Sequence, residues 1–301
     1  NAGRKLILLE KGQFPTDSYI ADGLSRLLGA DRCQTQSLDI SALTPDALSD
    51  SAVLLLSHGD DKAGSIRGMG GITKVAQSAG CLCSWDLAHS AGVIDMDLEA
   101  SQVDFAVGCT YKFLNGGPGA PGFLYAAERH QEAQNPLPGW MGHARLFDFE
   151  AEYEAAPGIK RFLTGTQSVL ALSAVRASLS LFDGLAMRDV RTQSLALTRH
   201  FMTLWQQSSA LQTHSVLVTP TDDAQRGSQV SLALDSAFPV SQALIADGVI
   251  VDFREPNIVR FGFSPLYNTF SDAERAIEAL EAMLVSKRYR LPDFQVRSTV
   301  T

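Results

Sequence analysis

Two short segments place groups of complementary chemistry directly after apolar runs. In "SWDLAHSAG" (84–92), Asp86 and His89 follow one such run, and in "GCTYKFLNGGPGAPG" (108–122), Tyr111 and Lys112 lead into a glycine-rich turn. A lysine amine forms Schiff bases with aldehyde cofactors, and a carboxylate keeps a pyridine nitrogen protonated so that the ring accepts electrons. A lone lysine is usually a solvated surface charge, but the two groups together predict this cofactor chemistry.

The segments around these residues alternate between strand and helix patterns. Short apolar runs predict strands at 5–10, 52–59, 81–86, 103–109 and 122–127. Helical patterns lie between them, at 14–30 and in the segment that Gly80 ends. This alternation predicts βαβ units, and therefore an α/β fold with a mostly parallel sheet covered by helices. Ligands bind beyond the carboxyl ends of such strands, so we expect Asp86 and Lys112 to share that edge.

The predicted helix at 14–30 has recognisable ends and an amphipathic pattern. Thr16 or Asp17 is its expected N-cap, and Gly29 is expected to end it. Its apolar side chains recur at helical spacing and form one stripe: Tyr19, Ile20, Leu24, Leu27 and Leu28.

The second half of the chain predicts a smaller α/β domain. Residues 135–157 are expected to form a long ordered loop, and a helix is expected at 166–182. We place the domain boundary so that residues 1–184 form a large domain and 185–301 a small one. In the small domain we expect strands at 228–235 and 258–265, a helix at 239–248, and a last helix that starts with a capping box from Ser271 to Glu274.

Composition excludes several classes of protein. The chain of 301 residues is 45% hydrophobic and carries a net charge of -8, which argues against nucleic acid as a partner. No apolar run approaches the length of a membrane span, and no signal peptide is recognisable, so a cytoplasmic location is expected. The cysteines and histidines lack metal-ligand spacing. We therefore expect no metal site and four free thiols, at Cys33, Cys81, Cys83 and Cys109.

Several longer motifs resemble the kynureninase family, in the same order along the chain. They are "FPTD" (14–17), "WDLAHSAG" (85–92), "GCTYKFLNGGPGAPGF" (108–123), "PLPGWMGH" (136–143), "FLTGTQ" (162–167) and "REPNIVRFGFSPLYNTF" (254–270). The resemblance implies a type I pyridoxal-phosphate (PLP) transferase fold. It also implies hydrolysis of L-kynurenine or 3-hydroxykynurenine, through a PLP Schiff base, to anthranilate or 3-hydroxyanthranilate and L-alanine. That reaction belongs to tryptophan catabolism, in the kynurenine pathway that leads to NAD biosynthesis.

The resemblance also implies roles for particular residues. Lys112 would form the Schiff base and transfer a proton at the substrate Cα, and Asp86 would pair with the pyridinium nitrogen. Tyr111 would reach the cofactor phosphate and relay a proton. The remaining cofactor contacts would come from Phe14, Pro15, Thr16, Asp17, Ser57 and His89, with Phe14 stacked on the ring.

Two further expectations concern the neighbouring subunit and the substrate. By resemblance, Trp140 and Thr166 reach the cofactor phosphate of a partner subunit, so the active site would lie at the interface of a homodimer. Arg260 would grip the α-carboxylate of a small amino-acid substrate, a task suited to a planar two-pronged donor. Arg254 is a comparable candidate for that task.

Alternatives remain open from the sequence. Another enzyme of the same fold, an aminotransferase or a cysteine desulfurase, would use the same lysine and aspartate. A desulfurase needs a reactive cysteine on a mobile loop, whereas these thiols lie in or beside predicted regular elements. Family members carry a segment before the residue that matches Arg4, and the printed sequence lacks it. A truncated, non-catalytic fragment is therefore the third alternative.

Overall fold

The computed structural model describes residues 3–297, and their contacts divide the chain into two compact units. The first unit comprises the chain up to His58 together with 68–91 and 96–183. The second comprises 59–67, 92–95 and the chain from Gly184 onward.

The first unit is built on a six-stranded sheet in the order β2-β1-β3-β4-β5-β6. The neighbouring strands run parallel, except that β5 and β6 pair antiparallel. This confirms the expected mostly parallel sheet. The strands are β1 (Leu6–Glu10), β2 (Gln34–Leu38), β3 (Ser51–Ser57), β4 (Leu82–Asp86), β5 (Phe105–Cys109) and β6 (Gly122–Ala126).

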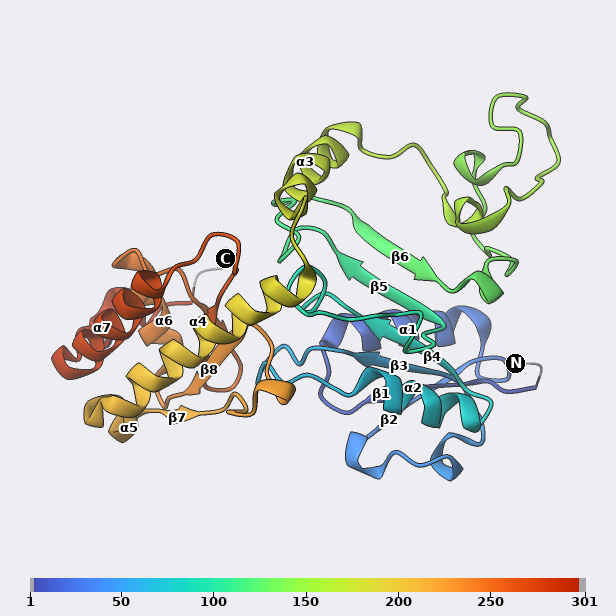
Figure 1. Cartoon of the computed structure of the whole chain (residues 1–301). Coiled ribbons are helices and arrows are strands. Elements are labelled where there is room, and N and C mark those ends of the chain that lie inside the picture. Colours follow the sequence, from blue (N-terminus) through green and yellow to red (C-terminus); the bar gives the residue numbers. More distant parts are fainter. Residues whose placement is uncertain (1–2, 298–301) are drawn as a thin grey trace. The chain divides into compact units, whose positions relative to one another are not determined.

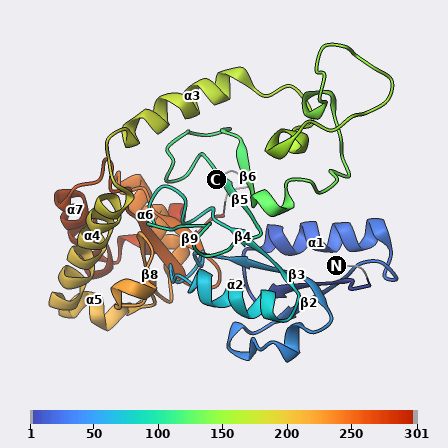
Figure 2. The same ribbon diagram turned by 45° about the vertical axis from the view of Figure 1, so that its right-hand side comes forward.

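Helices α1 (Pro15–Leu28) and α2 (Met69–Ser78) lie on opposite sides of this sheet (Figures 1 and 2). The strand order explains this arrangement. The connection from β1 to β2 moves toward one edge of the sheet, and the connection from β3 to β4 moves toward the other edge. Because both crossovers are right-handed, their helices lie on opposite faces. The core beneath α2 is well packed: the Trp85 side chain is fully buried, and its Nε1 donates to Thr73 Oγ1 at 3.0 Å.

The predicted N-cap of α1 is wrong. The helix begins at Pro15 with Phe14 as its N-cap, because proline needs no N–H partner in the first turn and its φ already suits a helix. The apolar stripe faces outward. Tyr19 and Leu27 are 68% and 80% exposed, and Ala21 is the one buried residue of the helix.

The chain between β6 and α3 (Val169–Leu179) contains short 3₁₀ turns, at Glu128–His130, Trp140–Gly142 and Gly158–Phe162, and an isolated β-bridge between His143 and Ala155. The loop predicted at 135–157 is therefore confirmed as irregular. The helix predicted at 166–182 starts three residues later than expected and finishes in a 3₁₀ turn, Ser180–Phe182.

The second unit holds an antiparallel sheet in the order β7-β8-β10-β9. Its strands are β7 (Val216–Leu217), β8 (Gln229–Ala233), β9 (Asp252–Arg254) and β10 (Ile258–Gly262). Its helices are α4 (Met187–Gln207), α5 (Ser209–His214), α6 (Ala237–Ala246) and α7 (Phe270–Ser286). Phe201, Leu232, Val259 and Leu280 lie at the centre of the core between sheet and helices.

The start of α7 corrects another prediction. The capping box is made by Thr269 and Asp272, each of which bonds the backbone N–H of the other, and not by Ser271 and Glu274. Both residue pairs have the spacing of a capping box, so spacing alone could not choose between them.

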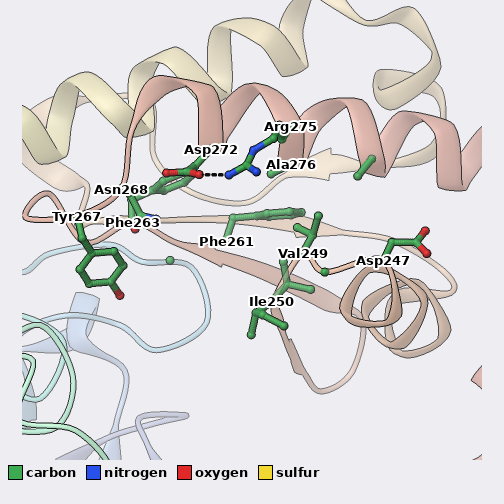
Figure 3. A pocket seen from close by; sticks show the side chains of 14 residues that line it. Asp247, Val249, Ile250, Phe261, Phe263, Tyr267, Asn268, Asp272, Arg275 and Ala276 are labelled. Atoms are coloured by element: carbon green, nitrogen blue, oxygen red, sulfur yellow. Dashed lines mark hydrogen bonds and ion pairs between the residues drawn. The ribbon is translucent and has the colours of Figure 1, made fainter.

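The second unit contains a cavity of about 520 Å³, lined by α7, β10 and the segment from Asp247 to Val251. Figure 3 shows the side chains that line it. Arg275 and Asp272 form an ion pair in its wall. None of the residues that the sequence assigned to the active site lines this cavity.

No single helix within residues 3–297 is both long and apolar enough to cross a membrane. Over the same residues, no group of three side chains has the arrangement of a metal site. All four cysteines are free thiols.

Candidate active site

The candidate site is built on the carboxyl ends of neighbouring strands in the first unit. Ser57 and Asp86 are the last residues of β3 and β4, and they are paired across the two strands. Both side chains are buried. The Asp86 backbone carbonyl accepts from the His58 N–H at 2.9 Å. The sheet pairing therefore continues past the strand end and holds the backbone that carries the Asp86 carboxylate.

A tight turn connects Asp86 to His89. The Asp86 carboxylate accepts from the Ala88 N–H at 2.7 Å, and the Leu87 N–H donates to the Val107 carbonyl of β5. The turn places the His89 ring against the loop that follows β5, where its Nε2 lies 3.1 Å from Lys112 Nζ. Residues that are 23 positions apart in the sequence are therefore in direct contact.

The loop that carries Lys112 closes on itself. The Gly116 N–H donates to the Thr110 carbonyl at 2.8 Å, and the Asn115 N–H donates to the Lys112 carbonyl at 2.8 Å. A Cβ on Gly116 would lie 2.8 Å from that Thr110 carbonyl oxygen, closer than side chains approach. Glycine at 116 is therefore needed to close this loop.

Aromatic rings border the Lys112 amine. Its Nζ lies 5.9 Å from the centre of the Phe14 ring and 5.7 Å from that of Tyr111, within the range of cation–π attraction. Phe14 is held at the start of α1, directly beyond β1. Pro15 and Thr16 are exposed in the first turn of the same helix, and Asp17 accepts from the Gln13 side chain at 3.3 Å. Phe14, His89, Tyr111 and Lys112 thus form one cluster.

This set of groups fits PLP chemically. A half-buried amine is available for the aldehyde, a buried carboxylate for the ring nitrogen, and an aromatic ring for stacking. All of them come from residues around the carboxyl ends of β1, β4 and β5, the edge where sheets of this kind bind ligands.

Trp140 and Thr166 belong to a different part of the first unit. Trp140 is 41% exposed and stacks on Phe149, with ring centres 6.2 Å apart. The Met141 N–H donates to the Thr164 carbonyl, and a Cβ on Gly139 would lie only 2.0 Å from that oxygen. Glycine at 139 therefore lets the segments that carry Trp140 and Thr166 pack together. The contacts described around Lys112 do not include either residue.

Arg260 lies on β10 in the second unit and is 8% exposed. Its guanidinium contacts the carboxylate of Asp252 and the carbonyl of Asp61. Arg254 lies near the same two aspartates but at 3.6 and 3.8 Å, and its side chain is 35% exposed. Sequence reasoning missed Asp252 and Asp61. The signal that could have found Asp252 is its position opposite Arg260 across a short hairpin.

Three of the four thiols lack the features of a sulfur-transfer residue. Burial raises the pKa of Cys81 to about 11 and that of Cys83 to about 12, and it also raises the pKa of Cys33. Only the thiolate is a nucleophile, so these cysteines are unreactive near neutral pH. Cys109 is half-buried at the end of β5, and its thiol lies 3.8 Å from the Ala88 carbonyl.

Comparison with known proteins decides the family. A kynureninase from Burkholderia mallei is 45% identical to this chain over 300 residues, which cover 99% of the chain and 72% of that protein. The chain belongs to the kynureninase family. The family profile described as kynureninase C-terminal domain matches residues 190–280, all of which lie in the second unit.

Solved structures confirm the fold expected of a kynureninase. A cysteine desulfurase from Thermococcus onnurineus superimposes with a TM-score of 0.77 at 18% identity, covering 94% of this chain and 73% of that one. A mutant of C-DES with glycine covalently linked to its PLP cofactor also gives 0.77, at 16% identity, covering 92% and 74%. At this identity the likeness establishes the type I PLP fold alone.

Proposed function

We propose that this chain hydrolyses L-kynurenine, or its 3-hydroxy form, to the corresponding anthranilate and L-alanine with PLP as cofactor. The proposal rests on membership of the kynureninase family. The observation that carries it is the meeting of Asp86, His89 and Lys112 at one sheet edge, because these residues belong to the motifs that resemble the family.

Bound PLP supplies an aldehyde for the substrate amine and a pyridine ring that accepts electrons from the substrate Cα. Lys112 would hold PLP through the cofactor aldehyde, and the Lys112 amine, once the substrate amine has taken its place, would transfer the proton at the substrate Cα. The buried Asp86 carboxylate keeps the ring nitrogen protonated, and Phe14 stacks on the ring. Tyr111, with its ring beside Lys112, serves as the phosphate contact and proton relay.

We assign the remaining predicted residues to the same enzyme. Ser57, Pro15, Thr16 and Asp17 complete the cofactor site beside Asp86 and Phe14, and Arg260 binds the substrate carboxylate. The first unit acts as the large cofactor-binding domain and the second as the small domain, with the boundary near 184. The enzyme serves tryptophan catabolism and NAD biosynthesis in the cytoplasm.

A homodimer completes the active site in this proposal, with Trp140 and Thr166 reaching the cofactor phosphate of the partner subunit. The exposure of Trp140 and of its neighbours Phe147 and Phe149, which are 73% and 74% exposed, supports an interface on this loop. Large exposed apolar clusters mark protein interaction sites. The outward-facing stripe of α1 is a second apolar surface of the same unit.

The alternatives have less support. A cysteine desulfurase would need a reactive thiol, but burial raises the pKa of three of the four. An aminotransferase shares the fold, but the 45% identity over 300 residues is to a kynureninase. A non-catalytic chain would keep this sheet and fail to bind PLP.

The test is to add PLP to the purified protein, record its visible absorption, add L-kynurenine and follow anthranilate fluorescence. The proposal expects a visible band and then fluorescence, both abolished in Lys112→Ala. A band without fluorescence, with turnover that depends on an added keto acid, would establish the aminotransferase instead. No band in the unmutated chain would support the non-catalytic alternative.

A further inference from the structure

Arg260 is held by contacts on two sides. Its Nε donates to one Asp252 carboxylate oxygen at 2.7 Å and its Nη2 donates to the other, so the aspartate grips one edge of the guanidinium with both oxygens. Its Nη1 donates to the Asp61 carbonyl oxygen. These three contacts use three of the five N–H groups, and they leave one N–H on each terminal nitrogen for a ligand.

The backbone fixes both partners. Asp252 and Arg260 are paired across the antiparallel strands β9 and β10. The Asp61 carbonyl also accepts from the Gln229 side chain at 3.3 Å, and the Thr219 hydroxyl donates to the Ala63 carbonyl at 2.7 Å, so the segment that contains Asp61 is bound to this sheet. A side chain as flexible as arginine is thereby limited to one orientation of its plane.

The Asp252 carboxylate lies beside two arginines, Arg260 and Arg254. Asp252 Oδ2 contacts Nη2 of Arg260 and lies 3.6 Å from Nη2 of Arg254. Asp61 is buried, and burial together with the neighbouring Asp60 raises its pKa. Without the Asp252 carboxylate, Arg260 would lose both hydrogen bonds that hold one edge of its guanidinium, and nothing described on that edge would fix its plane.

We propose that Asp252 is a positioning residue: it fixes the guanidinium plane of Arg260 so that the two remaining N–H groups meet the α-carboxylate of the amino-acid substrate. This inference rests on the proposed role of Arg260 as the carboxylate-binding residue. A two-pronged contact with a carboxylate requires both groups to be coplanar, so it is sensitive to rotation of the arginine.

A different role for Asp252, in which it competes with the substrate carboxylate for Arg260, predicts the opposite effect of removing Asp252. If Asp252 merely occupies the arginine when substrate is absent, its removal frees the arginine and tightens substrate binding. If Asp252 positions the arginine, its removal weakens binding. The sign of the change in affinity therefore separates the two.

The experiment compares L-kynurenine with the corresponding amine that lacks the α-carboxylate, on PLP-loaded protein. The spectral change of the cofactor on adding each compound gives the affinity, and anthranilate release gives KM and kcat for kynurenine. We expect Asp252→Ala to raise KM and weaken kynurenine binding about tenfold, with little change in kcat and none in the affinity for the amine. Asp252→Glu should recover part of the loss. Asp252→Asn, which keeps the shape, repeats the test if the alanine variant does not fold.

Two controls separate the possible failures. Asp247→Ala removes the exposed ion pair between Asp247 and Arg288, which lies in the same unit. This control variant should leave KM unchanged. Arg260→Lys should abolish the preference for kynurenine over the amine. If Arg260→Lys does so and the Asp252 variants bind kynurenine as well as or better than the unmutated protein, the inference is wrong and the proposed function stands. If Arg260→Lys keeps the preference, the proposed carboxylate site is wrong and the inference falls with it.

Discussion

Lys112 Nζ and His89 Nε2 lie 3.1 Å apart. This contact joins segment 84–92, which carries the carboxylate, to segment 108–122, which carries the amine. The strand that carries Asp86 pairs with the strand before Lys112, so the contact follows from the order of β4 and β5 in the sheet. An acid, an imidazole and an amine thereby share one edge.

Replacing His89 tests the importance of this contact for cofactor binding. His89→Ala removes the ring nitrogen beside the amine, and the loss of one hydrogen bond in a half-buried site should weaken PLP binding about tenfold. His89→Gln, which retains a polar group, should lose less. Titration of the apo protein with PLP, followed by visible absorption, measures both. Equal affinity for PLP in all three proteins would show that His89 does not support the cofactor.

Asp86→Asn separates the charge of the carboxylate from its structural role. The amide oxygen can still accept from the Ala88 N–H, so we expect the variant to fold and to bind PLP. Without the negative charge the ring nitrogen loses its proton, and kcat should fall by about 100-fold or more. Anthranilate release measures kcat, and thermal unfolding checks the fold. Full activity in a folded variant would exclude the proposed pairing with the ring nitrogen.

The start of α7 gives a prediction about stability and pH. Hydrogen bonds from the Thr269 backbone and from Arg275 lower the pKa of Asp272 from 3.8 to about 2. Because the pKa is lowered in the folded protein, the stabilisation is complete above pH 3.8 and is lost as the pH falls through about 2. Asp272→Ala should cost about 1 kcal/mol at neutral pH, and this difference should shrink in acid.

The matched variant is Glu274→Ala, which removes the residue that spacing alone would have placed in the capping box. We expect its effect on the free energy of unfolding to stay within about 0.5 kcal/mol, as for exposed positions generally. Urea unfolding at pH 7 and at pH 3 measures both variants. A larger loss for Glu274→Ala than for Asp272→Ala would contradict the observed cap.

The sequence predicted the strands that position the site, because buried parallel strands are short, continuous apolar runs. Strands β3, β4 and β5 lie within a residue or two of their predicted bounds. The edge strand β2, with the sequence QTQSL, was missed because three of its five side chains are exposed and its pattern is polar. The cluster around Lys112 was predictable for the same reason as the sheet: its residues follow the predicted strand ends.

The failures have a common physical cause. Periodicity identified the apolar stripe of α1 but could not tell what covers it, and in the structure Leu27 is 80% exposed. The partnership of Asp252 with Arg260 depends on the pairing of β9 with β10, and a short hairpin can pair in several registers that composition does not distinguish. Parallel strands bring their carboxyl ends to one edge of the sheet whatever the exact register, whereas the contact between Asp252 and Arg260 depends on the register of two strands.

Reduction of the PLP-loaded protein with borohydride, followed by peptide mass analysis, tests the central claim most directly. Borohydride converts a Schiff base to a stable amine, so the cofactor remains attached to the lysine that held it. We predict the label on the peptide that contains Lys112, and none in Lys112→Ala. Label on another lysine, or an unlabelled Lys112 peptide from protein that has taken up PLP, would contradict the account.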